Sequence, residues 1–256
     1  MTRLLTKQRQ QAIVEVIVRD GQATIDALCQ RFDVSPATIR RDLDDLDAQG
    51  AVQRTHGGAV RVMRAAPEPP ILQRSAEKAE AKRRIGQAAA VLVPDGKTVL
   101  ISSGTTTLEV ARALVGRQRL TVVTNAINIA YLLSESPHIA IVVLGGLLRH
   151  SELSLSGHLT EQALGELRAD LVFIGAHAIS VEHGVSADNL AEVMTDRALL
   201  AVGARRIVVA DSSKFGKFAT ARVVPLSAVH TLITDDGISP ALIERLREQG
   251  LEVVVV

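Results

Sequence analysis

The chain has 256 residues, of which 47% are hydrophobic, and its formal net charge is +1, so we expect one large and one small domain with a sizeable core. Aromatic residues make up 2% and Trp is absent, which argues against a stacking surface for single-stranded nucleic acid and favours duplex DNA as a target. The single cysteine, Cys29, excludes an internal disulfide, and without a signal segment or an apolar run of about 18 residues the expected compartment is the cytoplasm.

The first 62 residues are expected to form a winged helix-turn-helix. Apolar residues recur at helical spacing from Leu5 to Val18, and a shorter helix is expected from Thr24 to Arg31. After a turn over residues 32–34, Ser35 is a good N-cap and Pro36 suits the first helical position, so a third helix begins there. Two helices joined by such a turn are typical of DNA-binding proteins.

The third helix has the pattern of a recognition helix. Its apolar residues Ile39, Leu43 and Leu46 recur at helical spacing and are expected to face the core. The residues left to meet a major groove are Ser35, Pro36, Ala37, Thr38, Arg40 and Arg41. Arg40 with Asp44 and Arg41 with Asp45 could instead neutralise each other, although such i,i+4 pairs contribute only about 0.2–0.5 kcal/mol.

A hairpin wing is expected next. Residues 51–55 and 59–62 can pair around His56-Gly57-Gly58, where glycine permits a positive φ. We expect Arg54, His56 and Gly57 to contact DNA, while a turn-stabilising role for His56 is nearly as well supported.

These two segments carry a resemblance to a known family. Ser35-x-x-Thr38-Ile39-Arg40-Arg41-Asp42-Leu43, followed by Arg54-Thr55-His56-Gly57-Gly58-Ala59, resembles the DeoR family of bacterial transcriptional regulators. The resemblance extends to the C-terminus. It implies a winged helix-turn-helix joined to a sensor domain whose fold is similar to ribose-5-phosphate isomerases.

The predicted domain boundary is rich in proline. Pro67, Pro69 and Pro70 follow Arg64-Ala65-Ala66 and favour an extended linker. We therefore divide the chain into a DNA-binding domain (residues 1–62), a linker (63–74) and an effector-sensing domain (75–256). That last domain should open with a helical stretch from Ser75 to Leu92.

The third part has the pattern of an α/β domain with a mostly parallel sheet. Continuous apolar runs of Val, Ile and Leu predict buried strands that need helices on both faces. The strands are expected over residues 98–102, 120–124, 139–144, 171–175, 206–210, 231–234 and 251–256. The intervening helices are expected over residues 108–114, 127–133, 159–167, 192–202 and 240–249.

Ligands bind beyond the carboxyl ends of the strands in open α/β sheets, so the loops that follow the strands are the candidate site. The first loop offers Ser102, Gly104, Thr105, Thr106 and Thr107 at the start of a helix, which is typical of an anion-binding site. It lacks the Lys of a nucleotide-binding loop. The alternative is an ordinary Thr-capped helix start.

Further polar residues follow other strands and are expected at the same edge. They are Asn125, Gly145, Gly146, Arg149, Asp211 and Lys214. Together they offer cations for a phosphate and groups for hydroxyls. Each has an ordinary alternative, because Asn125 could cap a helix, the glycines could form only a turn, and Asp211 could pair with Lys214.

The family resemblance sharpens this expectation. Sensor domains of DeoR-like regulators bind phosphorylated sugars or related metabolites through Gly-Thr-Thr, Thr-Asn, Gly-Gly and Asp-Ser-Ser-Lys motifs, which this chain has. It departs from the family where Ser102 stands in place of a common Asp, and where His177 stands in a Gly-Ala-His-Ala segment that is often Gly-Ala-Asp-Gly. His177 could donate to an anion or be a structural histidine.

The leading hypothesis is a cytoplasmic repressor of carbohydrate-metabolism genes that binds operator DNA as a homo-oligomer, at least a dimer, and responds to a phosphorylated sugar. We expect no cofactor and no metal. An alternative is a sugar-phosphate isomerase-like enzyme with an accessory DNA-binding module, for which Asp211 and Glu192 are candidate bases without a recognisable catalytic pair. A DNA-architectural protein would leave the polar loops unexplained.

Overall fold

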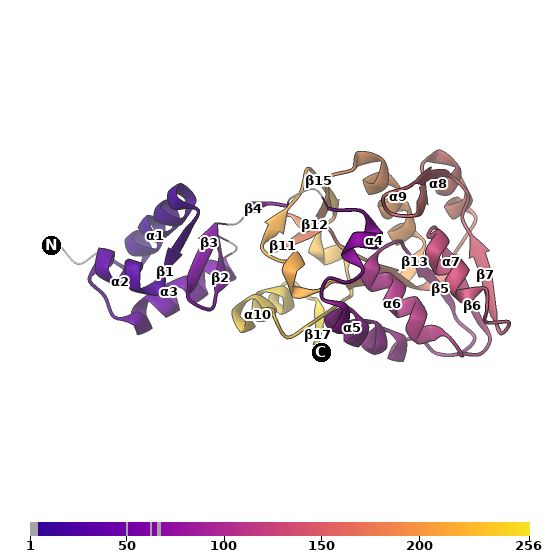
Figure 1. Ribbon diagram of the computed structural model, residues 1–256, viewed down its shortest axis with the longest axis horizontal. Helices are drawn as coiled ribbons and strands as arrows, with labels where there is room; N and C mark the ends of the chain where they lie inside the picture. The colour runs from indigo at the N-terminus through magenta and orange to yellow at the C-terminus, as the bar shows by residue number, and fades with distance from the viewer. Residues whose placement is uncertain (1–4, 50, 62, 66–67) are drawn as a thin grey trace.

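The computed structural model describes residues 5–49, 51–61, 63–65 and 68–256. Its N-terminal part is the expected winged helix-turn-helix, at the left of Figure 1. In order, the elements are α1 (Thr6–Asp20), β1 (Gln22–Thr24), α2 (Ile25–Phe32), α3 (Pro36–Ala48), β2 (Val52–Thr55) and β3 (Gly58–Arg61). β3 pairs antiparallel with both β1 and β2. Met1–Leu4, Gly50 and Val62, which belong to the expected domain, lie outside the described residues.

Helix α3 begins where the sequence predicts. The Ser35 hydroxyl accepts a hydrogen bond from the Thr38 backbone N–H at 3.3 Å, which satisfies a donor that has no partner within the helix. Ile39, Leu43 and Leu46 are buried in the domain core. Burial of these three side chains determines which side of α3 is exposed to solvent.

The wing turn is shorter than expected, and Gly58 is needed for a different reason. β2 and β3 pair Thr55 with Gly58, which leaves His56 and Gly57 as the turn. Neither glycine has a positive φ, so that expectation was wrong. Gly58 is required by space instead, because a Cβ there would lie 2.0 Å from the backbone oxygen of Ala23 in β1.

The linker is more ordered than its prolines suggested. Strand β4 (Met63–Arg64) pairs in parallel with β14 (Lys217–Phe218), and residues 71–74 form a helical turn, α4 (Ile71–Arg74). The helix expected from Ser75 begins later, as α5 (Ala79–Val91). Ala66 and Pro67 lie outside the described residues. Most of the linker is therefore docked on the larger domain.

The larger domain contains the expected parallel sheet. In the described part of the chain its strand order is β17-β16-β13-β10-β5-β6-β7, and every neighbouring pair is parallel. The strands are β5 (Thr98–Ile101), β6 (Leu120–Thr124), β7 (Ile139–Val143), β10 (Ala169–Ile174), β13 (Gly203–Val209), β16 (Thr231–Thr234) and β17 (Glu252–Val255). The helices between them are α6 (Thr105–Leu114), α7 (Ile127–Leu133), α8 (His158–Gly165), α9 (Leu190–Ala201) and α10 (Pro240–Glu248).

Helices cover both faces of this sheet because alternate side chains point to opposite sides. In β10, Phe173 packs in the cluster formed with α5, α6 and α7, whereas Val172 and Ile174 pack in the cluster formed with α9 and α10. The continuous apolar runs predicted this double burial.

Several short elements were not predicted. β8 (Leu147–Arg149) and β9 (Ser154–Ser156) form a hairpin after β7. β11 (Ala178–Ser180), β12 (Gly184–Ala187) and β15 (Ala221–Val224) form a second, antiparallel sheet, and the short 3₁₀ helices η1 (Ser212–Lys214) and η2 (Leu226–Ala228) lie in loops. The hairpin and the loop before β11 both reach the carboxyl edge of the parallel sheet.

The two domains touch through α3 and α10, which are neighbours in Figure 1. The Ser239 hydroxyl donates to Asp47 Oδ2 at 2.6 Å. A cavity of about 530 Å³ lies beside this contact and is lined by residues of both domains, including Arg54 and His56 of the wing. Within the described residues, every helix is too short or too polar to cross a membrane.

Candidate DNA-binding surface and effector pocket

The exposed side of α3 presents two arginines. Arg40 and Arg41 are exposed and make no ion pair with any described residue. Their expected partners are engaged elsewhere, because Asp44 pairs with Arg54 at 3.0 Å and Asp45 accepts a hydrogen bond from Gln10 at 3.0 Å. The pairing alternative is therefore wrong for this structure, and both guanidinium groups are available to an anionic partner.

The first turns of α3 also stay open. Ser35, Pro36 and Ala37 are exposed and Thr38 is half-buried. The interdomain cavity is lined by Asp44 and Asp47 from the second half of α3, and by none of the residues 35–41. The N-terminal half of α3 therefore faces away from the interdomain contact, as a helix entering a major groove requires.

The wing is braced from within its own domain. Arg54 donates to the backbone oxygen of Gly58 at 3.2 Å besides pairing with Asp44, so its guanidinium is already held. His56 and Gly57 are exposed at the tip. The backbone oxygen of Gly57 accepts a hydrogen bond from the N–H of Ile25, which ties the tip to the start of α2.

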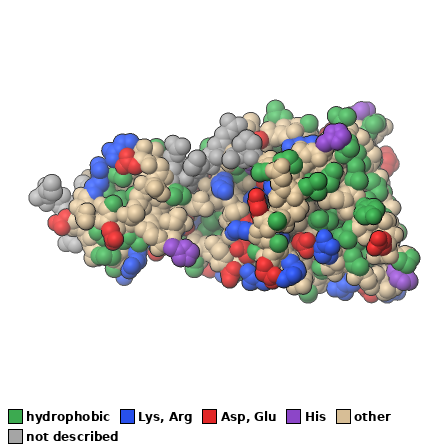
Figure 2. All heavy atoms as spheres, in the orientation of Figure 1, with side chains coloured by type: hydrophobic (Ala, Val, Ile, Leu, Met, Phe, Trp, Pro, Cys, Tyr) green, Lys and Arg blue, Asp and Glu red, His purple; other side chains and the backbone are tan. Residues whose placement is uncertain are grey.

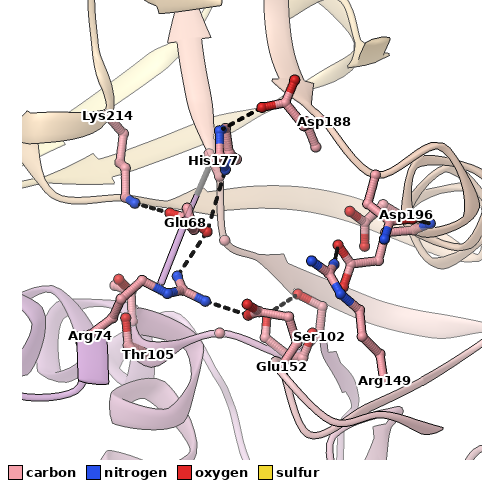
Figure 3. Close-up of a pocket in the computed structure, with 18 residues that line it drawn as sticks. Glu68, Arg74, Ser102, Thr105, Arg149, Glu152, His177, Asp188, Asp196 and Lys214 are labelled. Atoms are coloured by element: carbon pink, nitrogen blue, oxygen red, sulfur yellow. Dashed lines mark hydrogen bonds and ion pairs between the residues drawn. The ribbon is translucent and has the colours of Figure 1, made fainter. Parts of the chain in front are cut away.

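A cavity of about 350 Å³ lies at the carboxyl edge of the parallel sheet, where β5, β10 and β13 end side by side. Figure 3 shows side chains from the linker, the β8–β9 hairpin and α9 that converge on it. Seven of the expected effector residues line it: Ser102, Gly104, Thr105, Thr106, Arg149, His177 and Lys214. The sequence thus brings together residues that are more than 100 positions apart.

The remaining expected residues support the loops instead of lining the cavity. Asn125 accepts a hydrogen bond from the Ser103 N–H at 3.2 Å and donates to the Leu155 backbone oxygen at 3.0 Å, which joins the first loop to the β8–β9 hairpin. The Thr107 hydroxyl is fully buried and donates back to the Gly104 oxygen at 3.0 Å. These groups hold the backbone that a ligand would meet.

The two glycines before β8 have a packing role. The backbone oxygen of Gly145 accepts a hydrogen bond from the Thr160 hydroxyl at 2.6 Å. Gly146 has φ +150°, and a Cβ there would lie 2.3 Å from the Thr160 hydroxyl oxygen. This close approach to α8 places Arg149, at the end of β8, beside the cavity.

Asp211 caps the short 3₁₀ helix η1, which ends at Lys214. Its carboxylate accepts hydrogen bonds from the Ser213 N–H at 3.0 Å and hydroxyl at 2.5 Å, which caps η1. Burial raises the pKa of Asp211, but the Ser213 hydrogen bonds and the charges of Lys214 and Lys78 lower it further, so the net shift is downward. The expected alternative of an Asp211–Lys214 ion pair is not what forms, because Lys214 pairs with Glu68.

The cavity holds acidic residues that the sequence analysis did not assign to it. They are Glu68, Glu152, Asp188 and Asp196, and Glu192, which had been considered only as a catalytic base, joins them. Arg149 pairs with Glu192, while Arg74 pairs with both Glu152 and Glu68. Each of the cavity's Lys and Arg cations among the described residues is thus matched by a carboxylate.

Asp196 differs from the other carboxylates. It has no hydrogen bond or ion pair with a described residue, although Arg149 lies near it in Figure 3. Burial raises the pKa of Asp196, the charge of Arg149 lowers it and the Glu152 carboxylate raises it again, so that the pKa reaches about 7. Its i,i+4 spacing from Glu192 on α9 was the signal that could have placed both in one site.

His177 lies between two carboxylates. Its Nδ1 is 3.5 Å from Glu68 and its Nε2 is 3.5 Å from Asp188, and its side chain is 12% exposed. Among the described residues, no cluster of His, Cys, Asp and Glu side chains has the arrangement of a metal site. The cavity thus brings Lys, Arg and His side chains together with several carboxylates.

Known proteins match both domains. The family model of the DeoR-like helix-turn-helix domain matches residues 9–65, and that of the DeoR C terminal sensor domain matches residues 77–236. A ribose 5-phosphate isomerase A from Neisseria gonorrhoeae, in a crystal structure, is 17% identical over 52% of each chain, with a TM-score of 0.40.

Relatives match over nearly the whole length. The transcriptional repressor AccR of Agrobacterium fabrum is 34% identical over 252 residues, which are 98% of this chain and 97% of AccR. The glycerol-3-phosphate regulon repressor of Escherichia coli K12 is 33% identical over 228 residues, which are 89% of this chain and 90% of that protein. This chain belongs to the DeoR family of transcriptional regulators.

Proposed function

We propose that this regulator is a repressor of carbohydrate-metabolism genes whose affinity for operator DNA is reset by a phosphorylated sugar or a related metabolite. The observation that carries the proposal is the cavity at the carboxyl edge of the sheet. It joins Arg74, Arg149 and Lys214 to the backbone that leads into α6, and so combines cations with helix N–H groups. Its volume of about 350 Å³ suits a small metabolite.

Within this cavity we assign roles by chemistry. The phosphate would lie against Lys214 and the loop of Ser102, Gly104, Thr105 and Thr106. Arg149 and His177, with the neighbouring carboxylates, would take the hydroxyl groups or a second polar end. Thr107, Asn125, Gly145, Gly146 and Asp211 would act by shaping the loops, as their hydrogen bonds and close packing indicate.

For DNA, we propose that the N-terminal half of α3 enters the major groove. Arg40 and Arg41 would contact bases or phosphates, and Ser35, Pro36, Ala37 and Thr38 would approach the duplex. His56 and Gly57 would contact the backbone from the wing tip, and Arg54 would hold the wing in place. Figure 2 shows acidic and basic side chains intermingled on the visible face, so binding would depend on these local groups and not on a broad basic surface.

We also propose a homo-oligomer, at least a dimer, acting in the cytoplasm where the chromosome lies. Operators with two half-sites require paired recognition helices. β7 is an edge strand of the sheet, and large hydrophobic side chains near it are exposed: Tyr131, Val142, Val143 and Leu147. Figure 2 shows hydrophobic side chains over this end of the molecule, and an exposed apolar edge is suited to pairing with a second copy.

The isomerase-like alternative has little support. Of its two candidate bases, Glu192 is paired with Arg149 and Asp211 is buried and caps η1. Relatives that match 89–100% of the chain are named as repressors.

Thermal unfolding with a panel of phosphorylated sugars and polyols, each beside its unphosphorylated parent, tests the effector proposal. A ligand at 100 times its Kd should stabilise the protein by about 2.7 kcal/mol. The stabilising compound should then shift binding to an operator duplex selected from a randomised pool. If no phosphorylated compound stabilises the protein more than its parent, the effector class is wrong.

A further inference from the structure

Glu68, a carboxylate of the linker, lies between two cations of the cavity, Arg74 and Lys214. Glu68 accepts a hydrogen bond from Lys214 Nζ, and its Oε2 lies 2.9 Å from Arg74 Nη1. His177 approaches the same oxygen, as Figure 3 shows. Burial raises the pKa of Glu68, but the hydrogen bond from His177 and the charges of Lys214 and Arg74 lower it to about 2. The group is thus a half-buried, ionised anion.

Glu68 differs from the other acidic residues of the cavity in its place along the chain. Glu152, Asp188, Glu192 and Asp196 belong to the α/β domain itself, whereas Glu68 lies in the segment that leads from the wing to that domain. A movement of the Glu68 side chain would therefore affect the segment that connects the two domains.

Contacts before and after Glu68 hold the linker to the α/β domain. The Ala65 N–H donates to the Phe218 oxygen at 2.8 Å, and Ala65 packs on Ala178 and Ala219. Farther along, the Ile71 N–H donates to the Ser151 oxygen at 2.7 Å. Between these two anchors, Glu68 supplies a charged contact through its ion pair with Lys214.

We propose that Glu68 is an internal ligand of the anion site, which the effector's phosphate displaces, and that this displacement loosens the linker that carries the DNA-binding domain. The inference rests on the proposed function. Lys214 and Arg74 are already paired with Glu68, and a second negative charge beside this carboxylate would be repelled. A phosphate offers these cations three acceptor oxygens and close to two charges, against two oxygens and one charge on Glu68.

The competing arrangement keeps Glu68 in place and seats the ligand on Arg149, which would exchange Glu192 for phosphate. In that case Glu68 is a structural ion pair that fixes the linker. The two arrangements differ in whether phosphate binding and the linker contacts exclude each other.

Inorganic phosphate is the probe for the binding arm, used with full-length wild type, Glu68→Gln and Glu68→Ala at constant ionic strength. The affinity is read from the thermal midpoint as chloride is replaced by phosphate. Loss of the competing charge should tighten phosphate binding about tenfold, the equivalent of one charge-assisted hydrogen bond. Glu77→Gln is the matched control, since it removes the same charge from an exposed turn outside the cavity.

Hydrogen exchange is the structural arm. Phosphate should speed exchange of the Ala65 and Ile71 amides in wild type, although a ligand ordinarily slows exchange where it binds. In Glu68→Gln these amides should exchange faster from the start and respond little to phosphate.

Two results would overturn the inference. If phosphate stabilises wild type and both Glu68 variants equally and leaves the linker amides unchanged, Glu68 is a structural pair, while the proposed effector site stands. If neither phosphate nor any phosphorylated sugar stabilises wild type or the variants, the effector site and the role of Glu68 both fail.

Discussion

At the scale of single residues, the cations of the recognition helix and those of the cavity differ in whether they are paired with carboxylates. Arg40 and Arg41 are exposed and unpaired among the described residues, whereas Arg149 and Lys214 are paired with carboxylates. Unpaired surface cations can bind phosphates or bases without first breaking an internal contact. If the cavity binds the proposed effector, its paired cations should favour a ligand that can outcompete a carboxylate and should discriminate against weak anions.

Arg41→Ala tests the recognition helix. If Arg41 reads a base, the substitution should weaken specific operator binding by about 1–3 kcal/mol, whereas loss of a phosphate contact should weaken all sequences alike. Gel-shift titration with the operator and a scrambled duplex distinguishes the two. Arg83→Ala removes the same charge from an exposed position on α5 and should bind as wild type. Unchanged affinity of Arg41→Ala for both duplexes would exclude Arg41 from the interface.

Lys214→Ala tests the effector site. Removing this cation should cost about 1.5–3 kcal/mol of affinity for a phosphorylated ligand, the range of a charged hydrogen bond. Calorimetry measures the ligand affinity. Lys97→Ala is the control, because Lys97 precedes β5 at the opposite edge of the sheet and pairs with Asp170 at 2.9 Å. Wild-type ligand affinity in Lys214→Ala would remove Lys214 from the site.

The raised pKa of Asp196 predicts a pH-dependent stability. The folded protein holds the proton with a pKa of about 7 against an ordinary 3.8, so the stability from neutral Asp196 is complete below pH 3.8 and is lost as the pH rises through 7. Asp196→Asn should therefore raise the free energy of unfolding at about pH 8 but change it little at about pH 4.

Urea unfolding at both pH values measures this difference. Asp95→Asn, which removes an exposed carboxylate outside the cavity, should have little effect at either pH. A difference between Asp196→Asn and wild type that is the same at both pH values would contradict the prediction.

At the scale of elements, the sequence predicted what hydrophobic periodicity and capping determine. The parallel strands are continuous apolar runs, and Ser35-Pro36 starts α3 by local chemistry, so each is visible within a few residues. β11 and β12 are short, contain small residues and pair only after the chain has folded back, and no local pattern distinguishes them from loops.

The cavity was predictable only in part, for the same reason. Ser102, Gly104 and Thr105 follow a recognisable strand, and the rule of parallel strand ends places them. Glu68 and Glu152 reach the site from the linker and a hairpin whose docking depends on tertiary contacts.

The packing of the wing against β1 predicts the effect of a substitution at Gly58. Gly58→Ala should destabilise the DNA-binding domain by about 1–3 kcal/mol, because its Cβ would meet the Ala23 oxygen at 2.0 Å and push β3 away from β1. Gly57→Ala, one position earlier, has no atom within 4 Å of its Cβ and should be tolerated. Thermal unfolding compares the two variants, and equal stability would show that β1 and β3 do not pack as described.

At the scale of the whole molecule, two of the connections between the DNA-binding domain and the sensor in the described residues involve the linker and α3. One is the linker, which docks through β4 and Glu68. The other is the contact of α3 with α10, where Asp47 accepts from Ser239 and also from the Arg54 backbone N–H at 2.8 Å. Asp47 thus links the recognition helix, the wing and the α/β domain.

Coupling of effector binding to operator binding must be reciprocal. If a phosphorylated effector changes operator affinity by some factor, operator duplex must change effector affinity by the same factor, since both measure one coupling free energy. Calorimetric titration of the effector into protein alone, protein with operator and protein with scrambled duplex measures one side, and gel shift with and without effector measures the other. Glu68→Gln should reduce both factors together, because it loosens the linker before the effector arrives. A ligand that binds tightly in the cavity and leaves operator affinity unchanged would refute the proposed control of DNA binding.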